Sequence, residues 1–181
     1  MSPDARPPLR VAIVGSASSG KTTLAARLAQ HYRTTWVPEY LREFVEREAR
    51  VPVAADQIHI ARTQVAREQA AMAQARGFLF CDTTPLMTAV YSRHYFGGID
   101  AELAVLAAAH TYDITLVCAP ELPWVPDGLM REPEDVSGKV SALLFEELAA
   151  RGIPYTVVSG SAGERLIKVE LILGRPATLG G

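Results

Sequence analysis

Two glycines, a lysine and a threonine near the start of the chain stand at a spacing suited to holding phosphate groups. Residues 15–22 read Gly-x-x-x-x-Gly-Lys-Thr. The glycines allow successive main-chain N–H groups to turn into one hollow, and Lys21 can reach the outer phosphates of a nucleotide. The hydroxyl of Thr22 can hold the magnesium ion that accompanies ATP. We expect the phosphates to contact Gly15, Ser18, Ser19, Gly20, Lys21, Thr22 and Thr23.

The segments on either side of this loop distinguish a phosphate site from an ordinary turn. Residues 9–14 form an apolar run that predicts a buried strand, and residues 23–30 carry alanines and leucines at helical spacing. The start of a helix adds unpaired N–H groups and about half a positive charge. A turn without a ligand has no need for a lysine at position 21, so the pattern predicts a nucleotide site.

Strands and helices are predicted to alternate along the rest of the chain. Apolar runs predict strands at 34–37, 78–81, 114–118 and 153–158. Helical spacing predicts helices at 41–50, 56–76, 85–96, 100–110, 135–151 and 162–173. This alternation indicates an α/β fold of three layers, in which a parallel sheet carries helices on both faces.

The length of 181 residues suits a single domain. We expect this domain to span residues 9–173, between a disordered tail at 1–8 and a mobile tail at 174–181. Residues 119–133 contain several prolines and are long for a connection inside a compact domain. We therefore interpret them as a lid-like binding loop.

Bulk properties exclude several classes of protein. The net charge of −2 gives no general attraction to nucleic acid, and no apolar run approaches the ~20 residues of a membrane-spanning helix. Cys81 and Cys118 follow apolar runs and are expected in the core, not in a disulfide or a zinc site. With no signal peptide in the sequence, we expect a cytoplasmic protein without nucleic-acid or membrane partners, and a homo-oligomer remains open.

Carboxylates at the predicted ends of strands narrow the kind of phosphate chemistry. Glu39, Asp82 and Asp127 fall where ligands bind in parallel sheets, beyond the carboxyl ends of the strands. A motor-type ATPase would carry Asp-Glu after a strand, whereas Asp82 is followed by threonine, and the N-K-x-D motif of GTPases is absent. A small-molecule kinase remains, in which a carboxylate orients the acceptor hydroxyl and accepts its proton. Either Glu39 or Asp82 could be this base, and Asp82 could also hold the magnesium ion with Thr22.

Four blocks of sequence occur together in one order. They are E-Y-x-R-E-F-V at 39–45, F-C-D-T-T at 80–84, Y-D at 112–113 and P-W-V-x-D-G-L at 123–129. In this the chain resembles the nicotinamide riboside kinase domain of the NadR proteins, over residues 9–172. The resemblance implies a P-loop kinase fold and the ATP-dependent phosphorylation of the 5′-hydroxyl of nicotinamide riboside, which yields nicotinamide mononucleotide.

The resemblance also implies roles for individual residues. Lys21, Glu39, Asp82 and Arg131 would be catalytic, with Arg131 as the lid arginine. Glu39, Tyr40, Arg42, Gln64, Asp82 and Trp124 would bind the acceptor. Tyr40 and Trp124 could sandwich the cationic pyridinium ring, and Gln64 could bind its carboxamide.

Two positions depart from the family's pattern and leave other functions open. Pro38 stands where the family tends to have an aromatic residue, and Met130 displaces the lid arginine by one position to Arg131. A kinase of another nucleoside or nucleotide is one alternative. The other is a non-catalytic regulatory module that binds ATP or NAD.

Overall fold

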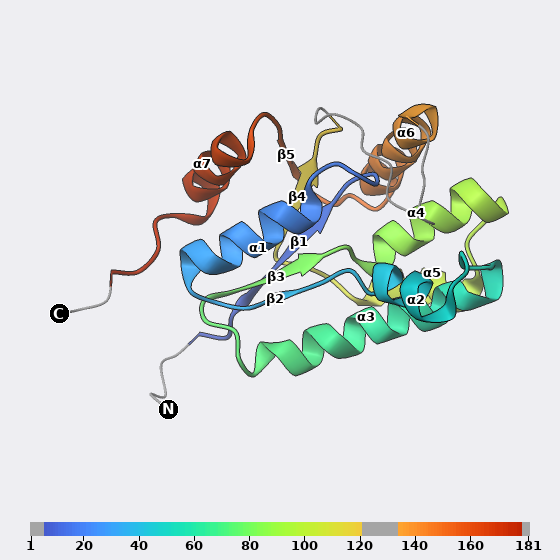
Figure 1. Ribbon diagram of the computed structural model, residues 1–181, viewed down its shortest axis with the longest axis horizontal. Helices are drawn as coiled ribbons and strands as arrows, with labels where there is room; N and C mark the ends of the chain where they lie inside the picture. The colour runs from blue at the N-terminus through green and yellow to red at the C-terminus, as the bar shows by residue number, and fades with distance from the viewer. Residues whose placement is uncertain (1–5, 121–133, 179–181) are drawn as a thin grey trace.

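The computed structural model describes residues 6–120 and 134–178, and it shows the predicted alternation of strands and helices (Figure 1). The elements in chain order are β1 (Leu9–Val14), α1 (Lys21–Tyr32), β2 (Trp36–Val37), α2 (Tyr40–Glu48), the short 3-10 helix η1 (Ala54–Asp56), α3 (Gln57–Met72), β3 (Phe78–Asp82), α4 (Pro85–Phe96), α5 (Ala101–Ala109), β4 (Ile114–Cys118), α6 (Glu134–Ala150), β5 (Thr156–Val158) and α7 (Ala162–Leu173).

The five strands form one parallel sheet in the order β2-β3-β1-β4-β5. The central strand β1 pairs with β3 on one side, where Ile13 lies opposite Asp82. On its other side it pairs with β4, where Val14 lies opposite Val117. The chain leaves β1 towards one edge of the sheet and later returns to the other side of β1. This reversal of strand order opens a crevice at the carboxyl end of β1, where α/β proteins bind their ligands.

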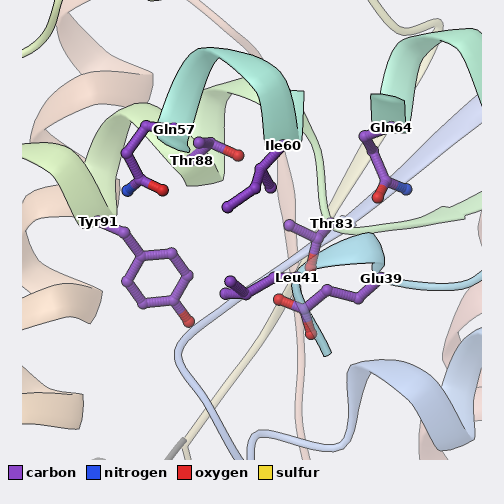
Figure 2. Close-up of a pocket in the computed structure, with 8 residues that line it drawn as sticks. All are labelled: Glu39, Leu41, Gln57, Ile60, Gln64, Thr83, Thr88 and Tyr91. Atoms are coloured by element: carbon purple, nitrogen blue, oxygen red, sulfur yellow. The ribbon is translucent and has the colours of Figure 1, made fainter. Parts of the chain in front are cut away.

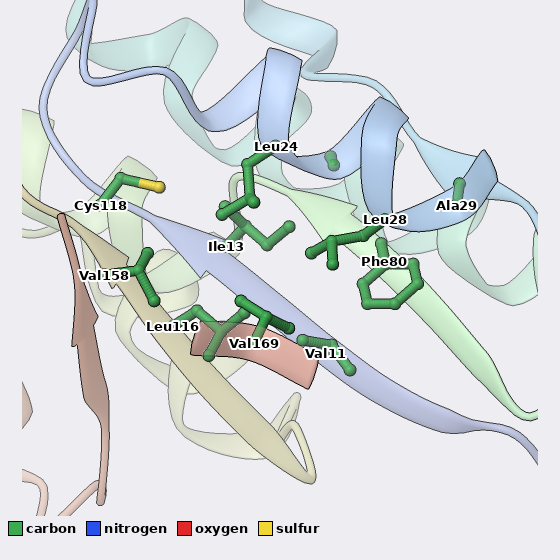
Figure 3. Packing of buried hydrophobic residues seen from close by; sticks show 11 residues of the cluster. Val11, Ile13, Leu24, Leu28, Ala29, Phe80, Leu116, Cys118, Val158 and Val169 are labelled. Carbon is green, nitrogen blue, oxygen red and sulfur yellow. The ribbon is translucent and has the colours of Figure 1, made fainter. Parts of the chain in front are cut away.

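Helices α1 and α7 cover one face of the sheet (Figures 1 and 3). Alternate residues of β1 point to this face, because successive side chains of a strand point to opposite sides. Val11 and Ile13 pack there against Leu24 and Leu28 of α1 and Val169 of α7. Burial of these side chains holds the first turn of α1 against the end of β1, and the phosphate loop lies between them.

Helices α3, α4 and α6 cover the opposite face, and α2 and α5 pack outside them (Figure 1). Val14 and Val117 of the sheet contact α4 and α6. Cys81 is buried under α3, and Cys118 is buried on the α1 side, so both thiols are free core residues as predicted. In the described ranges no helix is long and apolar enough to cross a membrane.

Several element boundaries differ from the sequence prediction, including those of α3, β5 and β2. Helix α3 ends at Met72 instead of residue 76, because the N–H of Arg76 donates to Thr34 Oγ1 at 2.7 Å instead of continuing the helix. Strand β5 begins at Thr156 instead of residue 153, since Pro154 has no N–H to offer to a ladder. Strand β2 consists only of Trp36 and Val37. The predicted tails and the lid-like loop lie partly outside the described residues.

The loop between β1 and α1 passes close to the end of β4 at Gly15, and we predict that Gly15→Ala perturbs it. A Cβ there would lie 2.8 Å from the carbonyl oxygen of Cys118 and 2.7 Å from Ser19 Oγ, at a φ of 154° that side chains rarely adopt. The strain should cost about 1–3 kcal/mol of unfolding free energy and weaken ATP binding. Denaturant melts and ATP titration test this, with Gly98→Ala in open space as the control. Equal effects of the two substitutions would contradict the expectation.

Candidate functional site

The phosphate loop has the backbone shape that its sequence predicts. Gly15, Ser18 and Gly20 all have positive φ angles, so the chain curls between β1 and α1. Lys21 is almost fully buried, and its ammonium donates to the carbonyl oxygen of Ser16 at 2.9 Å. A cavity of about 140 Å³ lies over residues 17–23 and also contacts Glu39, Arg42 and Tyr91. The loop and these three side chains therefore share one hollow.

The start of α1 is open to an anion. Among the described residues no side chain caps this helix, and its first turn contains no acidic residue. The free N–H groups and the helix dipole therefore favour a negatively charged ligand. The buried Ser19 hydroxyl has no hydrogen-bond partner within the described chain. An orphaned polar atom at this place fits a loop whose ligand supplies the missing contacts.

Asp82 contacts Thr22, which lines the hollow. Asp82 ends β3 and is fully buried, and its Oδ2 accepts a hydrogen bond of 2.6 Å from Thr22 Oγ1. These two oxygens belong to the donor class that magnesium prefers, and that ion takes its other ligands from phosphates and water. In the part of the chain that the structure describes, no group of three or more His, Cys, Asp or Glu residues could hold a metal. The donor set therefore fits a metal that arrives with a nucleotide.

Glu39 lies close to Asp82 although the two residues come from different strand ends. It precedes α2, which places its carboxylate in the same hollow. The hydroxyl of Thr83 links the two groups, because it lies 3.5 Å from Asp82 Oδ1 and also hydrogen-bonds to Glu39. The structure thus brings together the two carboxylates that the sequence predicted as candidates for the base.

Burial raises the pKa of both carboxyls. For Glu39 the positive charge of Lys21 partly offsets the desolvation, and the negative charge of Asp82 raises the pKa further. For Asp82 the desolvation is offset by Lys21 and by the hydrogen bond from Thr22, yet the pKa stays above its ordinary value. A carboxylate with a raised pKa is a stronger base, so the environment favours proton acceptance by this pair.

Thr83 adopts a strained backbone conformation. Its φ is 73°, in the left-handed region that a β-branched residue rarely occupies. Its N–H donates to the carbonyl oxygen of Ile13 at 3.0 Å, which fixes the end of β3 against β1. Strain of this kind persists where the surroundings impose it, and here it holds the hydroxyl between the carboxylates. Sequence reasoning did not find this residue, and its only signal was its place inside the F-C-D-T-T block.

Gln64 is positioned differently from the prediction that it binds a carboxamide. Its Oε1 accepts from the N–H of Tyr40 at 2.8 Å, and its Nε2 donates to the carbonyl oxygens of Pro38 at 3.2 Å and Asp82 at 3.4 Å. The side chain is buried and its amide is engaged with the main chain. Gln64 therefore ties the segment that carries Glu39 to the end of β3 that carries Asp82.

Tyr40, the predicted stacking partner for the acceptor, packs against neighbouring side chains. Its ring is buried with Phe44 and Ile60, and the guanidinium of Arg67 lies over it at 4.7 Å from the centroid. Its hydroxyl accepts from Arg47 Nη2 at 3.0 Å. The ring is thus part of the core between α2 and α3, and its role as a stacking partner for a ligand stays a prediction.

A second, smaller cavity lies between α2, α3 and α4 (Figure 2). It holds about 10 Å³, which is room for roughly one water molecule. Eight residues line it: Glu39, Leu41, Gln57, Ile60, Gln64, Thr83, Thr88 and Tyr91. Glu39 and Tyr91 also line the phosphate hollow, so the two cavities share a wall.

Gln57 is a further polar residue at this cavity. Its side chain is only 5 % exposed, and no hydrogen bond of its amide is found within the described residues. It precedes Gln64 by seven residues on the same helix, so the helical repeat indicates that the two glutamines share one face. The sequence does not show which of the two amides stays without a hydrogen bond. Gln57, Thr88 and Tyr91 were not predicted as site residues.

The remaining predicted residues fall into two groups. Arg42 lines the phosphate hollow, and its charge lowers the pKa of both Glu39 and Asp82, as expected for a residue of the site. Its neighbour Glu43 pairs with Arg67. Trp124, Asp127 and Arg131 lie outside the described residues, so their predicted roles remain predictions.

Comparison with known proteins gives matches over most of the chain. A family model described as an AAA domain matches residues 10–165. The trifunctional NAD biosynthesis/regulator protein NadR of Salmonella typhimurium is 30 % identical over 171 residues, which cover 90 % of this chain and 41 % of that protein. The chain therefore spans about two fifths of the length of this curated relative.

Solved structures share the fold. A NadR protein in complex with NR matches 97 % of this chain and 54 % of its own, with a TM-score of 0.81 and 22 % identity. A NadR protein in complex with NAD and AMP-PNP gives a TM-score of 0.77 at the same identity, covering 97 % of this chain and 52 % of that one. Deoxyadenosine kinase from M. mycoides gives a TM-score of 0.66 at 13 % identity. The match covers 91 % of this chain and 98 % of that one. The parallel sheet with its helices is therefore the fold of P-loop nucleoside kinases.

We predict that Gln64→Leu lowers turnover more than it lowers ATP affinity. The leucine fills the space but leaves the N–H of Tyr40 without its acceptor, so Glu39 can shift relative to Asp82. A displacement of about 1 Å between reacting groups can cost on the order of 100-fold in rate. Steady-state kinetics and ATP titration would measure the two effects, with exposed Gln69→Leu on the same helix as the control. An unchanged kcat in folded Gln64→Leu would contradict this positioning role.

A second prediction concerns stability and pH. Because burial raises the pKa of Glu39, the folded protein binds its proton more tightly than the unfolded chain does. The protonated Glu39 therefore stabilises the fold below the ordinary carboxyl pKa. This contribution to the free energy of unfolding is lost as the pH rises through the raised pKa of Glu39. Glu39→Gln should therefore exceed the wild type in unfolding free energy at pH 8, by on the order of 1 kcal/mol, and lose that advantage near pH 4.

Denaturant melts of the ligand-free protein at both pH values would test this. The exposed Glu46→Gln on α2 provides the matched charge change and should show no such gain. If Glu39→Gln were less stable than the wild type at pH 8, the ionised carboxylate would stabilise the fold. That result would contradict a pKa raised by burial.

Proposed function

The chain belongs to the AAA domain family, and on that premise we propose that it is an ATP-dependent kinase that phosphorylates the 5′-hydroxyl of nicotinamide riboside. The observation that carries the proposal is the placement of Glu39 and Asp82, joined through one hydroxyl, beside the phosphate loop. A nucleotide hydrolase has no need for a half-buried and a fully buried carboxylate, both with a raised pKa, next to a second cavity. The likeness to a NadR protein in complex with NR supports this choice of acceptor.

In this proposal the loop binds the phosphates of ATP. The N–H groups of residues 15–20 and the start of α1 bind the phosphate oxygens, and Lys21 exchanges its contact with Ser16 for the outer phosphates. Thr22 and Asp82 would hold the magnesium ion, which neutralises negative charge on the phosphates when bound. Arg42, at the rim of the hollow, adds a second positive charge near the transferred group.

Glu39 is the proposed base. Asp82 already accepts a hydrogen bond from Thr22, whereas Glu39 lines both the phosphate hollow and the second cavity. The 5′-oxygen of the acceptor attacks the γ-phosphorus, the bond from phosphorus to the ADP oxygen breaks, and the hydroxyl proton passes to Glu39. The raised pKa of Glu39 favours that transfer.

The cavity between α2, α3 and α4 is the proposed acceptor site. Leu41 and Ile60 offer apolar surface to a flat ring, and the unpaired amide of Gln57 offers hydrogen bonds to a carboxamide. Because the cavity has a volume of only about 10 Å³, its side chains must move when an acceptor binds. Tyr91 lies between this cavity and the phosphate hollow, so it is the side chain whose movement would join them.

One observation favours another nucleoside as the runner-up acceptor. Pro38 supplies no aromatic surface at the mouth of the site, and the likeness to deoxyadenosine kinase shows that the fold occurs in a kinase named for a different nucleoside. A kinase with the same base and loop but another acceptor would fit these facts equally well.

The function is tested by ADP release with ATP, Mg²⁺ and a panel of nucleosides that includes nicotinamide riboside. We expect phosphate transfer to nicotinamide riboside above the ATPase background. Glu39→Gln should lower kcat by roughly 10²- to 10⁴-fold with ATP affinity nearly unchanged, because a base acts in the transition state. Glu46→Gln, an exposed glutamate on the same helix, is the matched control.

Three outcomes would change the assignment. Turnover with another nucleoside alone would replace the acceptor and keep the kinase. Tight ATP binding without transfer to any nucleoside would favour a regulatory module. Full activity of Glu39→Gln would remove this residue as the base.

A further inference from the structure

Arg165 is a buried arginine that sequence reasoning did not connect with the site. It lies in the first turn of α7, and its side chain is only 2 % exposed. Its guanidinium donates to three main-chain carbonyl oxygens: Ser19 at 2.6 Å, Ala119 at 3.0 Å and Gly160 at 3.0 Å. Within the described ranges no carboxylate forms an ion pair with it. One cation thus joins the phosphate loop, the end of β4 and the turn between β5 and α7.

This arrangement carries an energetic cost that packing alone does not explain. A buried charge without a counter-ion loses its hydration, and an apolar side chain of similar length would fill the same space. The three bonds go to main-chain groups that lie up to 146 residues from Arg165 in the sequence. Arg165 therefore fixes the positions of three chain segments relative to one another. One of these segments is the phosphate loop, through Ser19.

The bond to Ser19 also sets the direction of a phosphate-binding group. In a planar trans peptide the carbonyl oxygen of one residue and the N–H of the next point in opposite directions. Arg165 holds the carbonyl of Ser19 on the protein side of the loop, so the N–H of Gly20 points to the opposite side. That side is the hollow bounded by Gly20 and Lys21. Gly20 also has a φ of 88°, in the left-handed region that favours glycine, and it stands at the N-cap of α1.

The charge of Arg165 acts in the same direction as this geometry. The guanidinium lies behind a loop that has no acidic residue in the following helical turn. Its field is weakly screened because it is buried, and it adds to the positive potential of the helix start. A triphosphate in the hollow would therefore be attracted by a charge that it does not touch.

We propose that Arg165 is a positioning residue that presets the phosphate loop for a triphosphate. The inference rests on the proposed function in so far as the ligand of the loop is ATP, but it does not depend on the acceptor. Lys21 makes one bond to the loop and is free to exchange it, whereas Arg165 makes three bonds and stays in place. The residue acts through Ser19 and Gly20 and has no direct contact with substrate.

Arg165→Met and Arg165→Lys test this, with exposed Lys168→Met on the same helix as the control for loss of a cation from α7. We measure the Kd of AMP-PNP with Mg²⁺ by calorimetry and the KM of ATP and of the acceptor. We expect ATP affinity to fall roughly 100-fold in Arg165→Met and roughly tenfold in Arg165→Lys. The acceptor KM at saturating ATP should stay within about twofold of the wild type, and Lys168→Met should bind ATP normally.

Chemical rescue distinguishes positioning from simple support of the core. In Arg165→Ala, guanidinium ion at low millimolar concentration can occupy the space and donate to the same carbonyls, so it should restore ATP affinity, whereas sodium at equal ionic strength should not. Unchanged ATP affinity in folded Arg165→Lys and Arg165→Met would overturn the inference, as would equal losses for ATP and acceptor. If the Arg165 variants lose ATP affinity but the wild type transfers no phosphate to nicotinamide riboside, the positioning role is supported and the proposed acceptor is overturned.

Discussion

The site depends on holding a fully buried carboxylate, Asp82, close to a half-buried one, Glu39. Asp82 and Glu39 repel each other, and burial makes the ionised state of each less favourable. Lys21, Thr22 and Thr83 oppose this with one positive charge and two hydroxyls. The balance leaves both groups as stronger bases than ordinary carboxylates, which is the property that removal of a hydroxyl proton needs. Strain in the backbone of Thr83 is part of the same arrangement.

Main-chain tethers from buried polar side chains keep the parts of this site in register. Gln64 connects the segment before α2 with the end of β3, and Arg165 connects the phosphate loop with β4 and the turn before α7. Both side chains are buried where apolar residues would be expected, and both bond to carbonyl groups of loops. The sheet sets the approximate positions of the loops, and these amide and guanidinium groups set the final ones.

The sequence predicted the fold, and it predicted which loop and carboxylates come together, because both follow from local patterns. The phosphate loop, the strand before it and the carboxylates at strand ends are visible as short motifs, and parallel topology brings them to one edge of the sheet. The sequence did not predict the surroundings of Tyr40, Gln64 and Arg165. Each is decided by contacts between distant segments, such as the 146 residues between Arg165 and Ser19. A helical repeat shows which face is buried, but it does not show which amide on that face is already paired.

The two cavities are built from different parts of the chain. The phosphate hollow is built mainly from the loop before α1 and its first turn, and the second cavity from α2, α3 and α4. Substitutions at Leu41, Gln57 or Ile60 can therefore reshape one cavity while the loop stays intact. Such a division allows the ligand preference of the second cavity to change while the phosphate loop keeps its shape.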